Sequence, residues 1–223
     1  MAEQYLAAFA VEEWRLRALV ASRDEDLVEG ALARLGPLRE EGRLLRATDA
    51  AEVERALRAL VAGPPAAFRA DTDTDAGTGA GTDGYEWLLE LLAPTLGEPV
   101  GSVVLPGRSW HVLEEAFRSW GLRALAELWG RSWTFPGTGG TGGTRAPDPW
   151  PFPMLAPRKD LEGIREELAA FDTGRVHDDY DLLPGGDDDV EDVVPLLEES
   201  FPAWIDAALR HDRDLLLIRD GGK

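Results

Sequence analysis

Residues 201–218, FPAWIDAALRHDRDLLLI, decide the fold that the sequence predicts. Phe201, Trp204 and Ile205 recur at the three- to four-residue spacing that places apolar side chains on one face of a helix. After a charged turn, residues 215–218 form a continuous apolar run, which is typical of a fully buried strand. The stretch therefore predicts a helix followed by a strand inside the core.

Outward from this stretch, apolar stripes indicate further helices and only a few strands. We expect the other helices at about residues 22–35, 49–62, 85–92, 109–120 and 158–171. We expect the other strands at 4–11 and, after a turn at Gly121, at 122–129. The predicted fold is α+β, a helix-rich single domain over residues 1–223 packed on a small mixed β-sheet. Two Gly-rich flexible insertions are expected at about 63–84 and 134–149.

Capping and helix-breaking residues predict where the helices begin and end. Ser22 and Glu25 have the spacing of a capping box, and Gly36 with Pro37 is expected to end that helix. Pro94 is expected to close the helix that begins near residue 85. The helix between them, capped by Asp49 and ended by Gly63, has a buried stripe that consists of Val53, Ala56, Leu57, Leu60 and Val61.

The net negative charge of the chain indicates which classes of binding partner to expect. The chain has 42 acidic and 23 basic residues and a formal net charge of −19. Such a surface repels nucleic-acid phosphates and anionic membranes, so we expect neither as a partner, whereas a basic protein would be attracted. The sequence has no cysteine, no secretory leader pattern and no apolar run of membrane-spanning length. We therefore expect a cytoplasmic protein.

Residues 171–192 hold the densest charge, with nine acidic residues against Arg175 alone. One interpretation is that these carboxylates maintain solubility and begin the next helix, where the helix dipole favours them. A second is a docking surface for a basic partner, and a third is metal ligation by His177 with Asp178 or Asp181. Because no second histidine stands at ligand spacing, we expect no metal. The candidate binding residues here are His177, Asp178, Asp179, Tyr180 and Asp181.

The eight tryptophans fall into two groups. One group occupies helical core positions and consists of Trp14, Trp87, Trp120 and Trp204. The other surrounds the second Gly-rich insertion and consists of Trp110, Trp129, Trp133 and Trp150. Aromatic side chains of this second group either pack in the core or rim a ligand cleft or a protein contact. The candidates for that contact are Trp110, Trp133 and Trp150.

Two ligand-binding motifs occur in form only. The G-x-G-x-x-G of Gly137, Gly139 and Gly142 precedes residues 145–149, RAPDP, which cannot begin the helix that a bound pyrophosphate requires. The D-x-D-x-D that begins at Asp71 lacks the glycine and the glutamate of a calcium loop. We interpret both segments as linkers and expect no cofactor.

The sequence carries no clear signal of catalysis. It has no G-x-S-x-G nucleophile turn, and a triad requires a hydroxyl presented to an oriented histidine. His111 can be paired with Glu114 or Glu115 on paper, but a chain of this size always permits such a pairing. We therefore lean against an enzyme.

Several segments carry a family resemblance. Residues 161–172 read L-x-x-I-x-x-x-L-x-x-F-D, and residues 201–208 read F-x-x-W-I-x-x-A before the final DLLLI. This layout resembles the YfbM-like bacterial domains of unknown function. With RALVASRDEDL at 17–27 and SWHVLEEAF at 109–117, the whole chain resembles a related uncharacterised actinobacterial family more closely. The resemblance implies helices packed against a small sheet and brings no catalytic residues.

Three hypotheses of function follow. The leading one is a non-catalytic protein-interaction or binding domain. A specific alternative is an immunity-type protein that neutralises a basic toxin through residues 177–192. A second alternative is a hydrolase-like enzyme with a His/carboxylate pair drawn from His111 or His177. A deep pocket that joins such a pair would favour the enzyme, whereas charge reversal within 177–192 tests the interaction.

Overall fold

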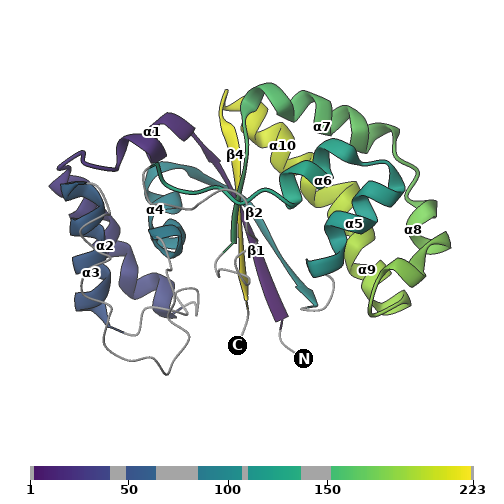
Figure 1. Cartoon of the computed structure of the whole chain (residues 1–223), viewed down its shortest axis with the longest axis horizontal. Helices are drawn as coiled ribbons and strands as arrows, with labels where there is room; N and C mark the ends of the chain where they lie inside the picture. Colours follow the sequence, from purple (N-terminus) through teal and green to yellow (C-terminus); the bar gives the residue numbers. More distant parts are fainter. Residues whose placement is uncertain (1–2, 41–48, 64–84, 107–109, 137–151, 222–223) are drawn as a thin grey trace. The chain divides into compact units, whose positions relative to one another are not determined.

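The computed structural model describes residues 3–40, 49–63, 85–106, 110–136 and 152–221 (Figure 1). In chain order, its elements are β1 (Glu3–Val11), α1 (Glu13–Ala18), α2 (Glu25–Glu40), α3 (Ala50–Ala62), the 3₁₀ turn η2 (Tyr85–Leu88), α4 (Leu89–Leu96), β2 (Glu98–Pro106), α5 (Trp110–Trp120), α6 (Arg123–Trp129), β3 (Phe152–Ala156), α7 (Arg158–Ala170), α8 (Gly174–Asp178), the 3₁₀ turn η3 (Tyr180–Leu182), α9 (Asp187–Pro195), the π-helical turn η4 (Leu196–Ser200), α10 (Phe201–Arg210) and β4 (Asp214–Gly221). The predicted helix-rich α+β class is confirmed.

The chain divides into two compact units. Unit 1 comprises Met1–Val11, Gly97–Trp133 and Pro153–Lys223, and unit 2 comprises Glu12–Leu96 and Thr134–Phe152. Unit 1 contains the sheet and the acidic segment, whereas unit 2 is built from helices. The single domain over residues 1–223 stays a prediction.

The sheet of unit 1 has the strand order β2-β1-β4-β3. The first strand of the chain is central: β1 pairs antiparallel with β2 on one side and with β4 on the other. Ala7, for example, lies opposite Ser102 of β2 and Ile218 of β4. Every residue from Leu6 to Val11 is buried, as expected of an apolar run without alternation. The predicted strands at 4–11 and 215–218 are therefore confirmed.

Helix α10 packs against β1, β2 and β4, and in Figure 1 the helices α5 to α10 lie together on one side of these strands. The predicted apolar face of α10 is buried, because Phe201, Trp204 and Ile205 are at most 4% exposed. The contact with β2 is close at Gly101, where an added Cβ would lie 1.9 Å from the Trp204 indole nitrogen. Only glycine fits at this position of β2.

The two edges of the sheet differ. At the β3 edge, Ser132 forms an antiparallel bridge with Met154, and the Trp133 amide donates to the Pro153 carbonyl at 2.8 Å. At the β2 edge, no backbone hydrogen bond joins the outer side of the strand to another residue that the structure describes. The β3 edge is therefore covered, and the β2 edge is left open by the described residues.

The predicted strand at 122–129 is wrong, because these residues form the helix α6. Gly121 does make the expected turn, with φ of 87°, but the chain enters a helix after it. The N-terminus of α6 is satisfied from a distance: the Glu167 carboxylate of α7 accepts the Ala124 amide at 3.0 Å and the Leu125 amide at 3.3 Å. The strands β2 and β3 have no counterpart among the elements predicted from the sequence.

In unit 2, α3 agrees with its prediction in full. The Asp49 side chain accepts the Ala51 amide at 2.9 Å, and the helix ends before Gly63. Its buried residues are the predicted stripe of Val53, Ala56, Leu57, Leu60 and Val61. The Arg23 amide donates to the Val61 carbonyl at 2.8 Å, which fixes the turn before α2 to the end of α3.

The boundaries of α2 and α4 differ from the prediction. Asp24, rather than the predicted Ser22, caps α2, because its carboxylate accepts the Leu27 amide at 2.9 Å. The helix α2 continues through Pro37 and buries Leu38, and α4 likewise continues through Pro94. A proline inside a helix removes one backbone hydrogen bond, and burial of the following turn offsets this loss in α2.

The predictions for Trp14 and for the two Gly-rich insertions have different outcomes. Trp14 is not a core residue, because 61% of its side-chain surface is exposed. The second insertion begins later than predicted: Phe135 is buried, and its amide donates to Glu86 at 3.3 Å. Most of both predicted insertions, including the G-x-G-x-x-G and D-x-D-x-D motifs, lies outside the described residues.

Candidate functional site

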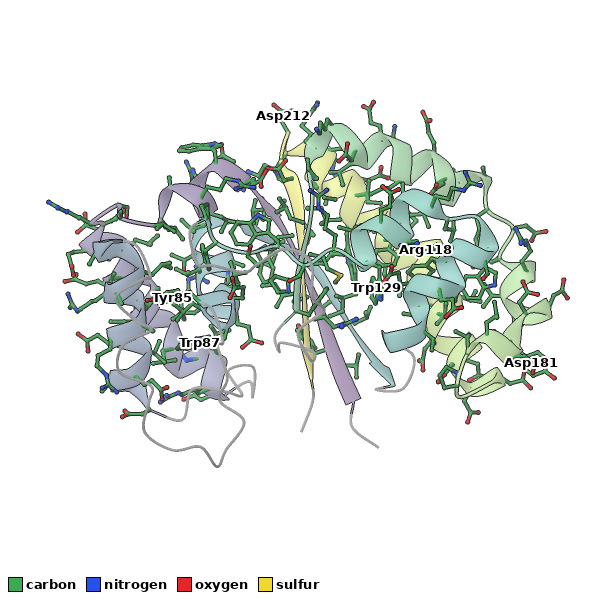
Figure 2. The ribbon with its side chains drawn as sticks, in the orientation of Figure 1. Tyr85, Trp87, Arg118, Trp129, Asp181 and Asp212 are labelled. Carbon is green, nitrogen blue, oxygen red and sulfur yellow. The ribbon has the colours of Figure 1, made fainter. Side chains whose placement is uncertain are left out.

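The acidic segment, residues 172–192 of unit 1, folds into short helical elements. It contains α8, η3 and the N-terminal half of α9. Its acidic residues are Asp172, Asp178, Asp179, Asp181, Asp187, Asp188, Asp189, Glu191 and Asp192. Figure 2 shows Asp181 at the outer end of this segment, directed away from the neighbouring helices.

The first turn of α9 contains three consecutive aspartates, which the helix dipole favours at this end. Asp189 differs from its two neighbours because its side chain is 2% exposed and accepts the Gly185 amide at 2.6 Å. A Cβ at position 185 would lie 2.3 Å from the Asp189 carboxylate, so the site requires glycine. Gly186 then takes a positive φ of 61°. Asp189 is thus part of the structure that begins α9, whereas Asp187 and Asp188 are exposed.

Burial raises the pKa of Asp192, and the neighbouring charges of Asp189, Glu191 and Asp188 raise it further. The second contribution is repulsion among carboxylates that share the first two turns of one helix. A cation placed nearby would relieve the repulsion.

Arg175 is the basic residue within the segment, yet it does not neutralise these acids. Its guanidinium donates to the Trp120 carbonyl at 2.8 Å and to the Ser119 carbonyl at 3.4 Å. These carbonyls lie at the C-terminal end of α5, where a positive charge also favours the helix dipole. Within the described ranges, none of the nine carboxylates of the segment forms an ion pair.

Two apolar side chains are exposed within the acidic segment. Tyr180 is 43% exposed and Leu182 is 37% exposed, and both belong to η3. The Tyr180 ring lies over Gly186, with its Cδ2 atom 3.8 Å from the position that a Cβ would occupy. Aromatic and aliphatic groups surrounded by unpaired charge are common at protein interfaces, where they supply contact area.

The first group of predicted binding residues comes from the acidic segment. His177, Asp178, Asp179, Tyr180 and Asp181 lie together from α8 to η3. All of these are exposed except Asp179, which is half-buried. That they bind a partner stays a prediction.

The predicted aromatic group does not assemble in the same way. Trp133 is 7% exposed, so its side chain belongs to the core rather than to a surface rim, and Trp129 is buried too. Trp110 begins α5, but its side chain lies outside the described residues, as does the whole of Trp150. Leu182 was missed because a single apolar residue in an acidic run gives no periodic signal.

The histidines and carboxylates considered for acid–base catalysis or metal binding make the following contacts. Glu114 forms an ion pair with Arg118 at 2.7 Å, and the His111 side chain lies outside the described residues. His211 lies 3.4 Å from Glu98, and both side chains are largely exposed. Among the described residues, no group of three or more His, Cys, Asp or Glu side chains could hold a metal ion. Within those ranges, every helix is too short or too polar to span a bilayer.

Comparison with known protein families shows which family the chain matches. A family described as a domain of unknown function, DUF7691, matches residues 2–219. The comparison with curated proteins and the comparison with solved structures gave no match.

Proposed function

The chain belongs to the DUF7691 family of domains of unknown function, and we propose from its own residues that it is a non-catalytic protein-interaction domain. The partner is a basic protein that contacts the acidic segment. The observation that carries the proposal is the set of carboxylates from Asp178 to Glu191 that remain exposed and without an ion pair in the described chain. A bound basic partner would supply the missing positive charge.

The local chemistry supports a protein partner over free cations. Tyr180 and Leu182 are exposed between the carboxylates, so a partner that buries them gains apolar contact as well as charge contact. Charges around an apolar centre mainly set the association rate and the choice of partner. Burial is the main cause of the raised pKa of Asp192, but the neighbouring carboxylates add to it, and an incoming Lys or Arg would relieve that added repulsion.

A more specific form of the proposal is an immunity-type protein that neutralises a basic toxin through residues 177–192. The short helical elements support this form, because they hold the carboxylates in a fixed arrangement before the partner arrives. The proposal includes a cytoplasmic location, an actinobacterial origin and the distant resemblance to the YfbM-like domains.

The test compares two charge-matched variants. One carries Asp178→Asn, Asp179→Asn and Asp181→Asn, and the other carries Glu29→Gln, Glu52→Gln and Glu162→Gln, which remove three exposed carboxylates from α2, α3 and α7. Both lose the same number of negative charges, so long-range attraction changes equally.

The measurement is affinity capture from source cells with quantitative mass spectrometry, followed by titration of each captured basic protein. The acidic-segment variant is expected to weaken binding by about tenfold or more, roughly 1.4 kcal/mol. The control variant is expected to bind like the wild type. If both variants lose a partner equally, or neither loses one, the acidic segment is not the interaction site.

A further inference from the structure

Among the residues that the structure describes, none covers the outer edge of β2 by backbone pairing. Residues 100–105, VGSVVL, lie between Pro99 and Pro106 and carry no charge. No described residue bonds to the outer side of this strand, and Val104 is 53% exposed. Natural proteins protect edge strands with charged side chains, internal prolines, β-bulges, short length or a covering segment. The β3 edge is short and covered. In β2 the pairing with β1 skips Val100, which marks a bulge at that residue, and the regular stretch from Gly101 to Leu105 has none of these protections among the described residues.

An extended segment is the chemical complement of such an edge. Its backbone amides and carbonyls can pair with the free groups of β2 and continue the sheet by one strand, while its alternate side chains set specificity. The β-branched residues Val103 and Val104, which lie in the regular part of the strand, favour pairing in an extended conformation. The edge therefore fits a strand-forming segment.

The charge of the occupant follows from the elements beside β2. Both α9 and η4 pack against this strand within unit 1. The helix α9 has exposed carboxylates at Asp187, Asp188 and Glu191, and η4 has two, at Glu198 and Glu199. At physiological salt, charges act over about 8 Å, so these carboxylates favour positive side chains on a strand added at β2.

A second copy of this chain is the poorer occupant. Pairing of β2 with β2 would bring two acidic α9 helices to one junction, and each chain has a net charge of −19. Like charges at an interface oppose association.

We propose that β2 is a docking edge for an extended, strand-forming segment of another protein that is rich in Lys or Arg. The segment adds as a new strand outside β2, and its basic side chains reach toward the carboxylates of α9. This inference rests on the proposed function and specifies how the basic partner binds.

The test uses two labelled peptides, each about ten residues long, the upper range of natural strands. The first alternates Lys and Val. The second has the same sequence with N-methyl groups on its four central residues, which removes amide donors from both of its edges and leaves its charge unchanged. Binding is measured by fluorescence anisotropy at about 0.15 M NaCl. The unmodified peptide is expected to bind at least about tenfold more tightly.

Two variants of β2 locate the binding. Val104→Lys adds to the exposed edge a charge that repels the peptide, and Val104→Glu is the matched control of opposite sign. Val104→Lys is expected to weaken binding by about tenfold or more, whereas Val104→Glu retains it. Because Val104 is exposed, both variants are expected to fold, which circular dichroism checks. Hydrogen exchange of the β2 amides is expected to slow when the peptide binds.

The outcomes separate this inference from the proposed function. Equal binding of the two peptides overturns strand addition but leaves the acidic segment as a binding site for a basic partner. No binding of either peptide, or equal binding to Val104→Lys and Val104→Glu, also overturns the docking edge. Sedimentation that shows a dimer of the free protein, lost in both Val104 variants, makes a second copy the occupant and overturns it too.

Discussion

Carboxylates have different surroundings in the acidic segment of unit 1 and in the helices α1 to α3 of unit 2. In α1 to α3 many carboxylates are bound by arginine: the ion pairs are Glu12–Arg15, Glu13–Arg17, Glu25–Arg58 and Glu54–Arg58. The hydrogen bond that Arg58 donates to Glu54 raises the pKa of Arg58, and the charge of Glu25 raises it further. In the acidic segment, no carboxylate has such a partner within the described chain, and Arg175 bonds to carbonyls instead.

This difference shows that net charge alone does not identify a binding surface. Ion-paired carboxylates at exposed helix faces contribute little stability and present little field to a partner. Unpaired carboxylates, by contrast, repel one another and gain when a cation arrives. Under the proposed function, the part of the −19 charge that binds a partner is the part that the described fold leaves without ion pairs.

The largest effect on stability is expected at Asp189, because this acid of the segment is buried and accepts a backbone hydrogen bond. Asp189→Ala leaves the half-buried Gly185 amide without its acceptor and is expected to lower the free energy of unfolding by about 1–3 kcal/mol. Asp189→Asn keeps an acceptor and is expected to retain most of the stability. Asp188→Ala, at an exposed position, is expected to change it by less than about 0.5 kcal/mol. Urea denaturation measures all three, and equal losses at 188 and 189 would contradict the distinction.

Arg175 offers the next largest effect. Arg175→Ala removes two hydrogen bonds to the end of α5 and is expected to lower the free energy of unfolding by about 1 kcal/mol. The same change is expected to tighten binding of a basic partner, because the segment loses its positive charge. Arg175→Lys is the control, because it keeps the charge but loses the two-pronged geometry. Its free energy of unfolding is expected to lie between those of the wild type and Arg175→Ala. Unchanged stability in Arg175→Ala would mean that the arginine is available to the carboxylates after all.

The smallest effect on stability is expected at Asp192, and this effect depends on pH. Its pKa is raised above 3.8 in the folded protein, so its ionised form is disfavoured by folding. Asp192→Asn is therefore expected to raise the free energy of unfolding at pH 7, by roughly 0.5 kcal/mol or less at this partly exposed site. The gain is expected to shrink as the pH falls through the raised pKa and to vanish below about 3.8, where the folded and unfolded forms are both protonated.

The control for that experiment comes from the paired region. Glu54→Gln removes one negative charge that Arg58 binds at 3.1 Å, so it is expected to lower stability at pH 7 rather than raise it. Urea denaturation across pH compares each variant with the wild type. A gain in stability from both variants would show that general charge reduction, and not local pairing, controls the two regions.

Much of the fold could be predicted because its signals are local. The α3 stripe and its Asp49 cap lie within one stretch of chain, and the apolar run at 215–218 has no helical alternative of that length. The helix α6 could not be predicted in the same way, because its capping group is Glu167, 43 residues from Ala124. Tertiary contact overrode the strand preference that its position after Gly121 suggested.

The strands β2 and β3 were missed for a different reason. Both contain prolines, and residues 98–106 also contain Gly101, so each stretch has the composition of a loop. Gly101 is required by the approach of Trp204, a contact that no local pattern reveals. The concentration of acids could be predicted for the candidate site, but the separation of buried Asp189 from its exposed neighbours depends on the backbone at Gly185.

The central position of β1 has a consequence for synthesis on the ribosome. This strand ends at Val11, but β2 begins only at Glu98 and β4 only at Asp214, so an apolar strand emerges long before either neighbour. Pairings between such distant residues make folding slow, and a waiting strand is prone to association. A nascent chain halted before Asp214 would leave one side of β1 unfilled, so we expect unit 1 to complete its fold late in translation and to need protection until then.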